Sequence, residues 1–288
     1  MKAPSFHDPK RVADVWVERA GLVSEEAARA EVKPARDDRE RVCAFGIDCQ
    51  IGFCTPGASL FVPGAVEDMQ RTLAWLYANL ERVTEIALSL DTHRLHQIFH
   101  PAFWLDAAGN APKPFTRISA KEVKDGRFRP AKAPAEDALA YVEKLEASGK
   151  YTLMVWPFHT LLGGTSHAIV PALWEASMFH ALARETEIFL RTKGSDAMTE
   201  MYSVLSAEIG GAFDRELFDR LASFDKIYVF GQAKSHCVLA TLRDLRPMAS
   251  KIFLLEDATS SVPGFDVRDA YEELRSAGMH FVKTTDPI

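Results

Sequence analysis

Short runs of apolar, often β-branched residues alternate along the chain with longer segments of helical periodicity. The apolar runs predict strands over residues 42–47, 84–90, 151–155, 187–190, 226–230 and 251–255. The helical pattern predicts helices over residues 65–80, 134–147, 171–184, 235–246 and 266–276, often opened by proline or an acidic residue. Strands that alternate with helices are typical of parallel sheets, so we expect an α/β fold, a three-layer sandwich with a mainly parallel central sheet.

Two segments depart from this alternation. Residues 1–40 are charged, and Val12, Trp16 and Val23 give them one weak apolar helix face, so we expect an N-terminal helical arm before a domain over residues 41–288. Residues 109–134 are rich in proline, glycine and lysine and interrupt the alternation of strands and helices after the second strand. We expect them to form a long loop or insertion that covers a site.

Composition and charge exclude several classes of partner. Acidic residues outnumber basic ones 40 to 34, and no dense basic run is interleaved with aromatic residues, so nucleic acid is not expected as a partner. No segment has the apolar core of a signal peptide or about 18 consecutive apolar residues, so we expect no membrane association and a cytoplasmic location. The four cysteines are too unevenly placed for a disulfide framework and are expected to be reduced.

Polar residues follow the predicted strands at the point where each strand ends. In an open parallel sheet, ligands bind beyond the carboxyl ends of the strands, so these residues are expected to meet on one face. They are Asp48, Asp91 with His93, His159, Lys193 and Cys237.

Cys237 lies where a strand passes through Gly231 into a helix whose first turn contains the cysteine. Backbone N–H groups and the helix dipole at such a position favour a thiolate and a developing oxyanion. Asp48 is placed to act as a general base, and Lys193 to hold its charge. Taken singly, each residue has a structural alternative: a packing cysteine, a loop-capping aspartate and a solvated lysine.

Asp91, His93 and His159 form a set of two histidines and one carboxylate that suits Zn, Mn or Fe. The D-x-H pair alone is a weak signal. The same segment supplies His96 and His100, and spacing does not decide whether these two are ligands, supports of ligands, substrate contacts or surface residues.

Five segments, in order over residues 40–262, resemble motifs of the nicotinamidases within the isochorismatase-like cysteine hydrolases. They are IDCQIGFCTPGASLFVPG at 47–64, LDTH at 90–93, WPFHTLLGGT at 156–165, KGSDAMTEMYS at 193–203 and YVFGQAKSHCVLATLRD at 228–244. The resemblance leaves the N-terminal arm, the 109–134 insertion and the C-terminal end uncovered. It implies the isochorismatase-like hydrolase fold for residues 41–288.

The resemblance also implies an activity: metal-assisted hydrolysis of nicotinamide to nicotinate and ammonia through a thioester on the cysteine. It implies a divalent metal, zinc first and Mn or Fe as alternatives, and by analogy a homo-oligomer. The implied site comprises the triad Asp48, Lys193 and Cys237, the metal ligands Asp91, His93 and His159, an oxyanion hole from the N–H groups of Ala233 and Cys237 with a cis peptide between Gln232 and Ala233, and the substrate-pocket residues Phe53, Trp156 and His236.

Four positions depart from the family pattern: Thr92 for Trp, Thr160 for Cys, Lys234 for Thr and His236 for Tyr. An altered pocket follows, so a small-molecule amide is a firmer expectation for the substrate than nicotinamide itself. The alternatives are a cysteine hydrolase acting on another amide or carbamoyl compound and, from another class, a catalytically silent binding protein on the same fold. A Rossmann-type nucleotide binder is rejected because no G-x-G-x-x-G follows the first strand.

Overall fold

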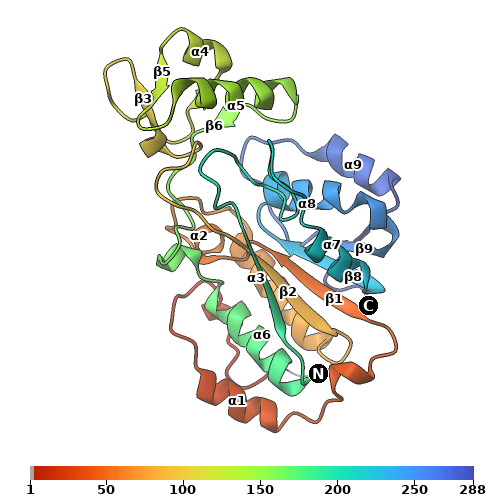
Figure 1. Cartoon of the computed structure of the whole chain (residues 1–288). Helices are drawn as coiled ribbons and strands as arrows, with labels where there is room; N and C mark the ends of the chain where they lie inside the picture. Colours follow the sequence, from red (N-terminus) through yellow and green to blue (C-terminus); the bar gives the residue numbers. More distant parts are fainter. Residues whose placement is uncertain (1–2) are drawn as a thin grey trace.

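Six parallel strands form the central sheet in the order β10-β9-β8-β1-β2-β7 in a computed structural model that describes residues 3–288 (Figure 1). Their bounds are β1 (Val42–Ile47), β2 (Glu85–Asp91), β7 (Ile188–Lys193), β8 (Lys226–Gly231), β9 (Ile252–Leu255) and β10 (His280–Val282). Five of these strands were predicted from apolar runs. The short β10 was not, because its three residues carry too little pattern.

Helices cover both faces of the sheet, which confirms the three-layer α/β sandwich (Figure 1). One layer contains α1 (Ala20–Ala28), α3 (Ala65–Ala78) and α6 (Pro171–Ala183), and the other contains α7 (Arg215–Ala222), α8 (Leu239–Asp244) and α9 (Arg268–Ser276). Successive residues of β1 point to opposite faces, so Ala44 packs in the first layer and Phe45 in the second.

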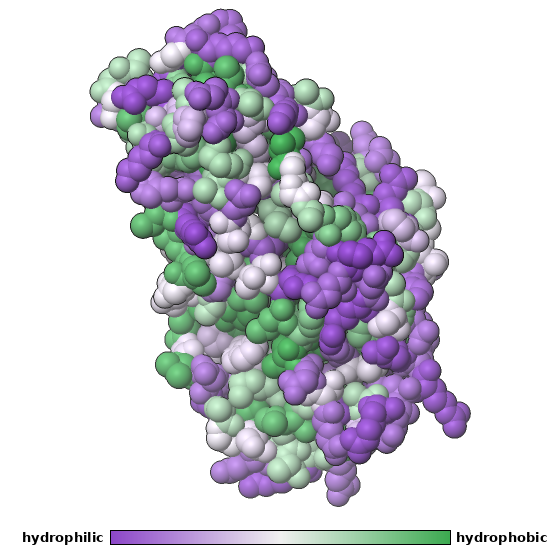
Figure 2. All heavy atoms as spheres, viewed as in Figure 1, coloured by the Kyte–Doolittle hydropathy of each residue, from purple (hydrophilic) through white to green (hydrophobic). Residues whose placement is uncertain are grey.

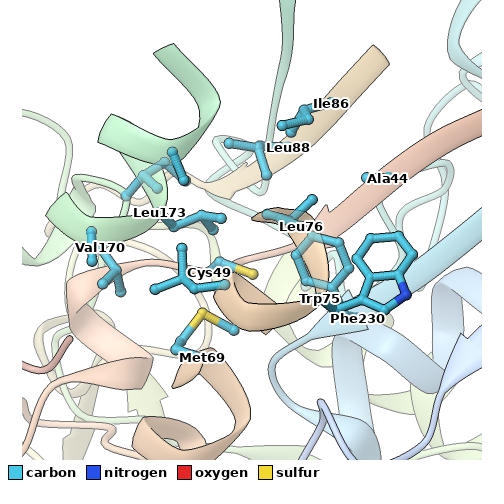
Figure 3. Close-up of a cluster of buried hydrophobic side chains, with 14 of the residues drawn as sticks. Ala44, Cys49, Met69, Trp75, Leu76, Ile86, Leu88, Val170, Leu173 and Phe230 are labelled. Carbon is cyan, nitrogen blue, oxygen red and sulfur yellow. The ribbon is translucent and has the colours of Figure 1, made fainter. Parts of the chain in front are cut away.

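Figure 3 shows the first of these cores, where Leu76 of α3 and Leu173 of α6 pack near Leu88 of β2. These three side chains are at most 3% exposed. Burying a leucine side chain contributes about 1.5–3 kcal/mol, so such packing holds the helices on the sheet and fixes where its strands end.

A small lobe lies between β2 and β7 and forms the top of the molecule in Figure 1. It contains the antiparallel pairs β3 (Trp104–Asp106) with β5 (Phe128–Pro130) and β4 (Arg117–Ile118) with β6 (Leu153–Met154), together with α4 (Ala120–Lys124) and α5 (Ala135–Ala147). The lobe has a hydrophobic core of its own, which includes Trp104, Ile118 and Leu145. The segment 109–134 thus contributes β4, α4 and β5 to this lobe, joined by turns and loops.

The prediction that residues 151–155 form a strand of the central sheet is wrong. Leu153–Met154 pairs with β4 instead, and Leu153 and Val155 are buried in the core of the lobe. A short apolar run does not specify its partner, which here is supplied by residues brought near by the insertion. The helix predicted over 134–147 is present as α5, but it packs in the lobe rather than on the sheet.

The N-terminal segment contacts the sandwich through α1, whose Val23 and Ala27 belong to the same core as α3 and α6. The Arg19 guanidinium also forms an ion pair with the buried Glu175 of α6, with 2.6 Å between Nη2 and Oε2. The boundary between an arm at 1–40 and a domain at 41–288 stays a prediction. On the face in Figure 2, hydrophobic residues gather over α6 and β7, while the far end of the lobe is mostly hydrophilic.

Within residues 3–288, each helix is either too short or too polar to cross a bilayer.

Candidate active site

Four adjacent strands of the sheet end in polar side chains that meet below the small lobe. Asp48 directly follows β1, Asp91 is the last residue of β2 and Lys193 is the last residue of β7. Cys237 follows β8 within a single turn of π-helix at Lys234–Val238. All four residues are buried, as expected from their placement at strand ends.

Lys193 lies at the centre of this group. Its Nζ is 3.0 Å from Oδ2 of Asp48, 2.9 Å from Oδ1 of Asp91 and 3.6 Å from Sγ of Cys237, and it also donates to the Met201 carbonyl at 2.9 Å. A buried ammonium is tolerated only when its charge is compensated, and two carboxylates compensate it here. The lysine therefore places Asp48 and Cys237 beside each other.

Burial is the largest influence on the pKa values of Cys237, Asp48 and Lys193. It raises the pKa of Cys237 and of Asp48, although the Lys193 charge opposes both shifts. Burial also opposes the charge on Lys193, but the two carboxylates outweigh it and hold the pKa of Lys193 well above its usual value. Burial thus favours the thiol form of Cys237, with the Asp48 carboxyl group beside it and the Lys193 cation next to both.

Asp91, His93 and His159 lie together, with one possible ligand atom from each within 4.8 Å of the others. The Nε2 atoms of His93 and His159 are 2.7 and 3.5 Å from Oδ2 of Asp91. Each Nδ1 faces a backbone carbonyl, that of Gly194 at 2.9 Å for His93 and that of Pro157 at 2.7 Å for His159. A carbonyl only accepts, so Nδ1 carries the hydrogen and Nε2 presents a lone pair toward Asp91. Three converging lone-pair atoms fit a divalent cation.

His159 reaches this position from a loop, not from the end of a sheet strand as its sequence context suggested. The loop is fixed to the end of β2 because His93 N donates to the Thr160 carbonyl at 3.1 Å and Leu162 N donates to the His93 carbonyl at 2.9 Å. Thr160 adopts a positive φ of 43°, which turns the chain at this point.

The structure separates the two additional histidines. His96 is exposed, whereas His100 is fully buried with its ring centroid 5.6 Å from those of both His93 and His159. Nδ1 of His100 faces the Arg94 carbonyl at 2.9 Å, and Nε2 has no hydrogen-bond partner among the described residues. His100 thus borders the metal-binding trio, and His96 does not.

Residues beside the predicted ones hold the site in place. The Gln50 carboxamide donates to the Asp91 carbonyl at 2.9 Å and accepts from the Asp91 N–H at 2.8 Å, and the Ser89 hydroxyl donates to Asp48 at 2.6 Å. At Gly194, with φ +77°, a Cβ would lie 2.8 Å from Oδ1 of Asp91. The sequence did not predict these supporting roles of Gln50, Ser89 and Gly194. The glutamine of the D-x-Q motif and the glycine after Lys193 were the only local indications of them.

A pocket with a cavity of about 50 Å³ opens beside Cys237. Phe53, Trp156 and His236 all line it, together with Lys193 and the metal-binding trio. Their predicted contact with substrate stays a prediction, but each is placed where that contact could occur.

Glu200 lines the same pocket and was not predicted. It is 2% exposed, and it accepts hydrogen bonds from Tyr202 at 2.7 Å and from Tyr141 of α5 at 3.2 Å. Burial raises the pKa of Glu200 to about 7. No sequence signal marked it, because a glutamate between strands is ordinarily exposed.

The predicted cis peptide between Gln232 and Ala233 is confirmed. Ala233 lines the pocket beside Cys237, and its N–H donates no hydrogen bond within residues 3–288, so this group is free to face a ligand. Just before it, Gly231 has φ +115°, and a Cβ there would lie 2.1 Å from the Ile47 carbonyl oxygen. Only glycine allows β8 to turn this closely over β1.

No family model matches the chain, and no curated protein matches its sequence. Solved structures do match. The Acinetobacter baumanii nicotinamidase and pyrazinamidase is 18% identical with a TM-score of 0.59 over 87% of this chain and 99% of that one. The yeast nicotinamidase bound to the inhibitor nicotinaldehyde is 17% identical with a TM-score of 0.61 over 84% and 99%. The Pyrococcus horikoshii pyrazinamidase in complex with zinc is 17% identical with a TM-score of 0.53 over 84% and 99%.

These similarities span almost the whole length of the three solved chains. They confirm the fold that the sequence motifs implied: this chain has the nicotinamidase-like, isochorismatase-type α/β fold.

Proposed function

We propose that this protein is a metal-assisted cysteine amidohydrolase that converts a small aromatic carboxamide, nicotinamide first, into a carboxylate and ammonia. The observation that carries the proposal is the position of Lys193, whose Nζ lies within 3.6 Å of Asp48, Asp91 and Cys237 at the edge of one buried pocket. A nucleophile, an acid–base group and a cation next to a set of metal ligands are the parts that amide hydrolysis requires.

In the proposed mechanism, Asp48 takes the thiol proton and the Cys237 sulfur attacks the amide carbon. Asp48 then delivers that proton to the nitrogen as the C–N bond breaks, which leaves a thioester and releases ammonia. Asp48 next takes a proton from water, whose oxygen attacks the thioester carbon. The C–S bond then breaks, the sulfur regains a proton from Asp48, and the acid leaves. The N–H groups of Ala233 and Cys237 are the proposed donors to the oxyanion.

Asp91, His93 and His159 are the residues that would hold the metal, with zinc as the first candidate. A bound divalent cation would supply an electrophile for a ring nitrogen or another donor atom of the substrate. Phe53 and Trp156 are proposed to hold the substrate ring between them, and His236 to line its outer side. The buried position of all three beside Cys237 supports these roles.

A different amide or a carbamoyl compound is the second candidate for the substrate, and the residues that line the pocket support it. Thr92, Thr160, Lys234 and His236 replace the residues usual in nicotinamidases, and the buried Glu200 adds a carboxyl group to the lining. A catalytically silent binding protein is disfavoured because the triad and the metal-ligand set are complete. Assembly into a homo-oligomer and a cytoplasmic location stay proposals that rest on analogy and composition.

The decisive experiment is ammonia release from nicotinamide by protein whose metal content has been measured. Cys237→Ala should abolish release, and Cys43→Ala is the matched control, because Cys43 is also buried in the same core but lies on β1 and does not line the catalytic pocket. Circular dichroism would establish that both variants fold. Turnover retained in Cys237→Ala would overturn the mechanism, whereas metal-loaded protein inactive on nicotinamide would direct the search to other amides.

A further inference from the structure

A second cavity, of about 320 Å³, lies next to the catalytic pocket. Trp156, Tyr202 and His236 line both cavities, so they form a partition between the two. The three side chains touch one another: Trp156 Nε1 donates to Tyr202 Oη at 3.1 Å, and the His236 ring centroid is 5.3 Å from each of the other two. A ligand in the second cavity would therefore pack against the outer face of the wall that bounds the catalytic pocket.

Three cationic side chains line this outer cavity and lack ion-pair partners. Arg117 comes from β4, Lys150 from the segment after α5 and Arg243 from α8, and none forms an ion pair or a side-chain hydrogen bond within residues 3–288. Cations that line one cavity and form no ion pair create a positive potential that attracts small anions, and guanidinium groups bind carboxylates in a planar, two-point geometry.

The nearby acidic groups form no ion pair with these cations within residues 3–288. Asp266 lines the cavity, but both of its oxygens accept from Arg268. Asp244, next to Arg243 in sequence, accepts from the hydroxyls of Ser203 and Ser206, and Glu208 attracts Lys150 electrostatically without a direct ion-pair contact. The catalytic pocket differs, because its cation Lys193 is compensated by Asp48 and Asp91. An anion is thus favoured on the outer side of the partition.

Aromatic side chains form much of the remaining wall. The Tyr151 ring is nearly parallel to the His236 ring, with 18° between their planes and 6.3 Å between centroids, and the Phe265 centroid lies 4.5 Å from that of His236. Such surfaces suit the face or edge of a flat ring. We propose that the outer cavity is a binding site for a small aromatic carboxylate, held by Arg117, Lys150 and Arg243. The assignment does not depend on the proposed reaction, although the product of that reaction belongs to this class.

Calorimetric titration of the full chain with benzoate tests the site directly. The site variant is Arg117→Gln with Arg243→Gln. Its matched control is Arg129→Gln with Arg246→Gln, which makes the same charge change at two exposed arginines that also lack ion pairs within the described chain and do not line the cavity. Thermal unfolding should show both double variants folded, because none of the four arginines has an ion-pair partner to lose.

We expect saturable binding at one site, at least about tenfold weaker in the site variant and within about twofold of the parent in the control, as expected for the loss of charge-assisted hydrogen bonds. Benzyl alcohol, a neutral analogue of similar shape, should bind much more weakly. Benzoate affinity that is equal in the site and control variants would place the ligand elsewhere, for example in the catalytic pocket, and would overturn the proposal. Equal affinity for benzyl alcohol, or no benzoate binding at all, would overturn it as well.

Discussion

Asp91 accepts a hydrogen bond from Lys193, with 2.9 Å between Oδ1 and Nζ, while its second oxygen lies 2.7 Å from Nε2 of His93. One carboxylate therefore belongs both to the metal-binding trio and to the group formed by Lys193, Asp48 and Cys237. Burial alone would raise the pKa of Asp91, but its contacts with His93, Lys193 and His159 outweigh burial and keep that pKa well below its usual range. A change at this residue should disturb metal binding and catalysis together.

Replacing Asp91 by asparagine should weaken zinc affinity by at least about tenfold, because the amide supplies a neutral ligand where the site has an anion. Zinc titration monitored by calorimetry, together with metal content after dialysis, measures the effect. Asp125→Asn is the control, since Asp125 is exposed at the end of α4. Unchanged zinc affinity in Asp91→Asn would remove this residue from the metal site.

Asp48→Asn should lower kcat by at least about 100-fold, because asparagine cannot carry the proton from the thiol to the leaving nitrogen. The fold should survive, since Lys193 keeps its contacts with Asp91 and the Met201 carbonyl. Steady-state ammonia release under saturating amide is the measurement. Ser89→Ala, which removes a hydrogen bond to Asp48 but leaves its carboxylate, should have a much smaller effect. A rate in Asp48→Asn within tenfold of the parent would exclude it as the acid–base group.

Gly231→Ala should destabilise the protein severely, by about 3 kcal/mol or more, because the added Cβ would lie 2.1 Å from the Ile47 carbonyl oxygen at a positive φ. Gly126→Ala isolates the backbone contribution. Gly126 also has a positive φ, +71°, but a Cβ there meets nothing within 4 Å, so its cost should be about 1 kcal/mol. Urea unfolding of the two variants compares them, and equal losses would mean that β8 and β1 can separate locally.

The sequence predicts the sheet and the strand-end residues well because both depend on local signals. Asp48 and Asp91 each end a run of buried residues, Lys193 ends the edge strand β7, and parallel strands bring such ends to one edge. The strand order and the small lobe depend on contacts far apart in the chain, so residues 151–155 were assigned to the wrong sheet. His159 was found through its motif, although a loop and not a sheet strand positions it.

Glu200 shows what the sequence could not reveal. The charge of an isolated glutamate gives no sign of burial, and its burial here depends on Tyr141, which α5 of the lobe brings to it. Partners that only the tertiary fold supplies leave no local pattern in a single sequence. The same holds for Arg117, Lys150 and Arg243 of the outer cavity, which come from separate elements and form no ion pair in the part of the chain that the structure describes.

The buried Glu200 should make stability depend on pH in a defined direction. Burial raises its pKa from 4.5 to about 7, so the folded state holds the proton more tightly than the unfolded chain does. The stabilising contribution of the protonated form is complete below about pH 4.5 and is lost as the pH rises to about 7, a change of up to about 3 kcal/mol at roughly 1.4 kcal/mol per pKa unit.

Glu200→Gln removes this titration, so the free energy of unfolding of the parent should fall relative to that of the variant between pH 5 and pH 8. Urea unfolding at intervals across this range measures the difference, in which other titrating groups largely cancel because they are present in both proteins. Glu136→Gln, at an exposed glutamate of α5, is the control and should follow the parent at every pH. A Glu200→Gln profile that also ran parallel to that of the parent would contradict this prediction, because the carboxyl group would then titrate alike in the folded and unfolded chains. Its burial between Tyr141 and Tyr202 opposes that outcome.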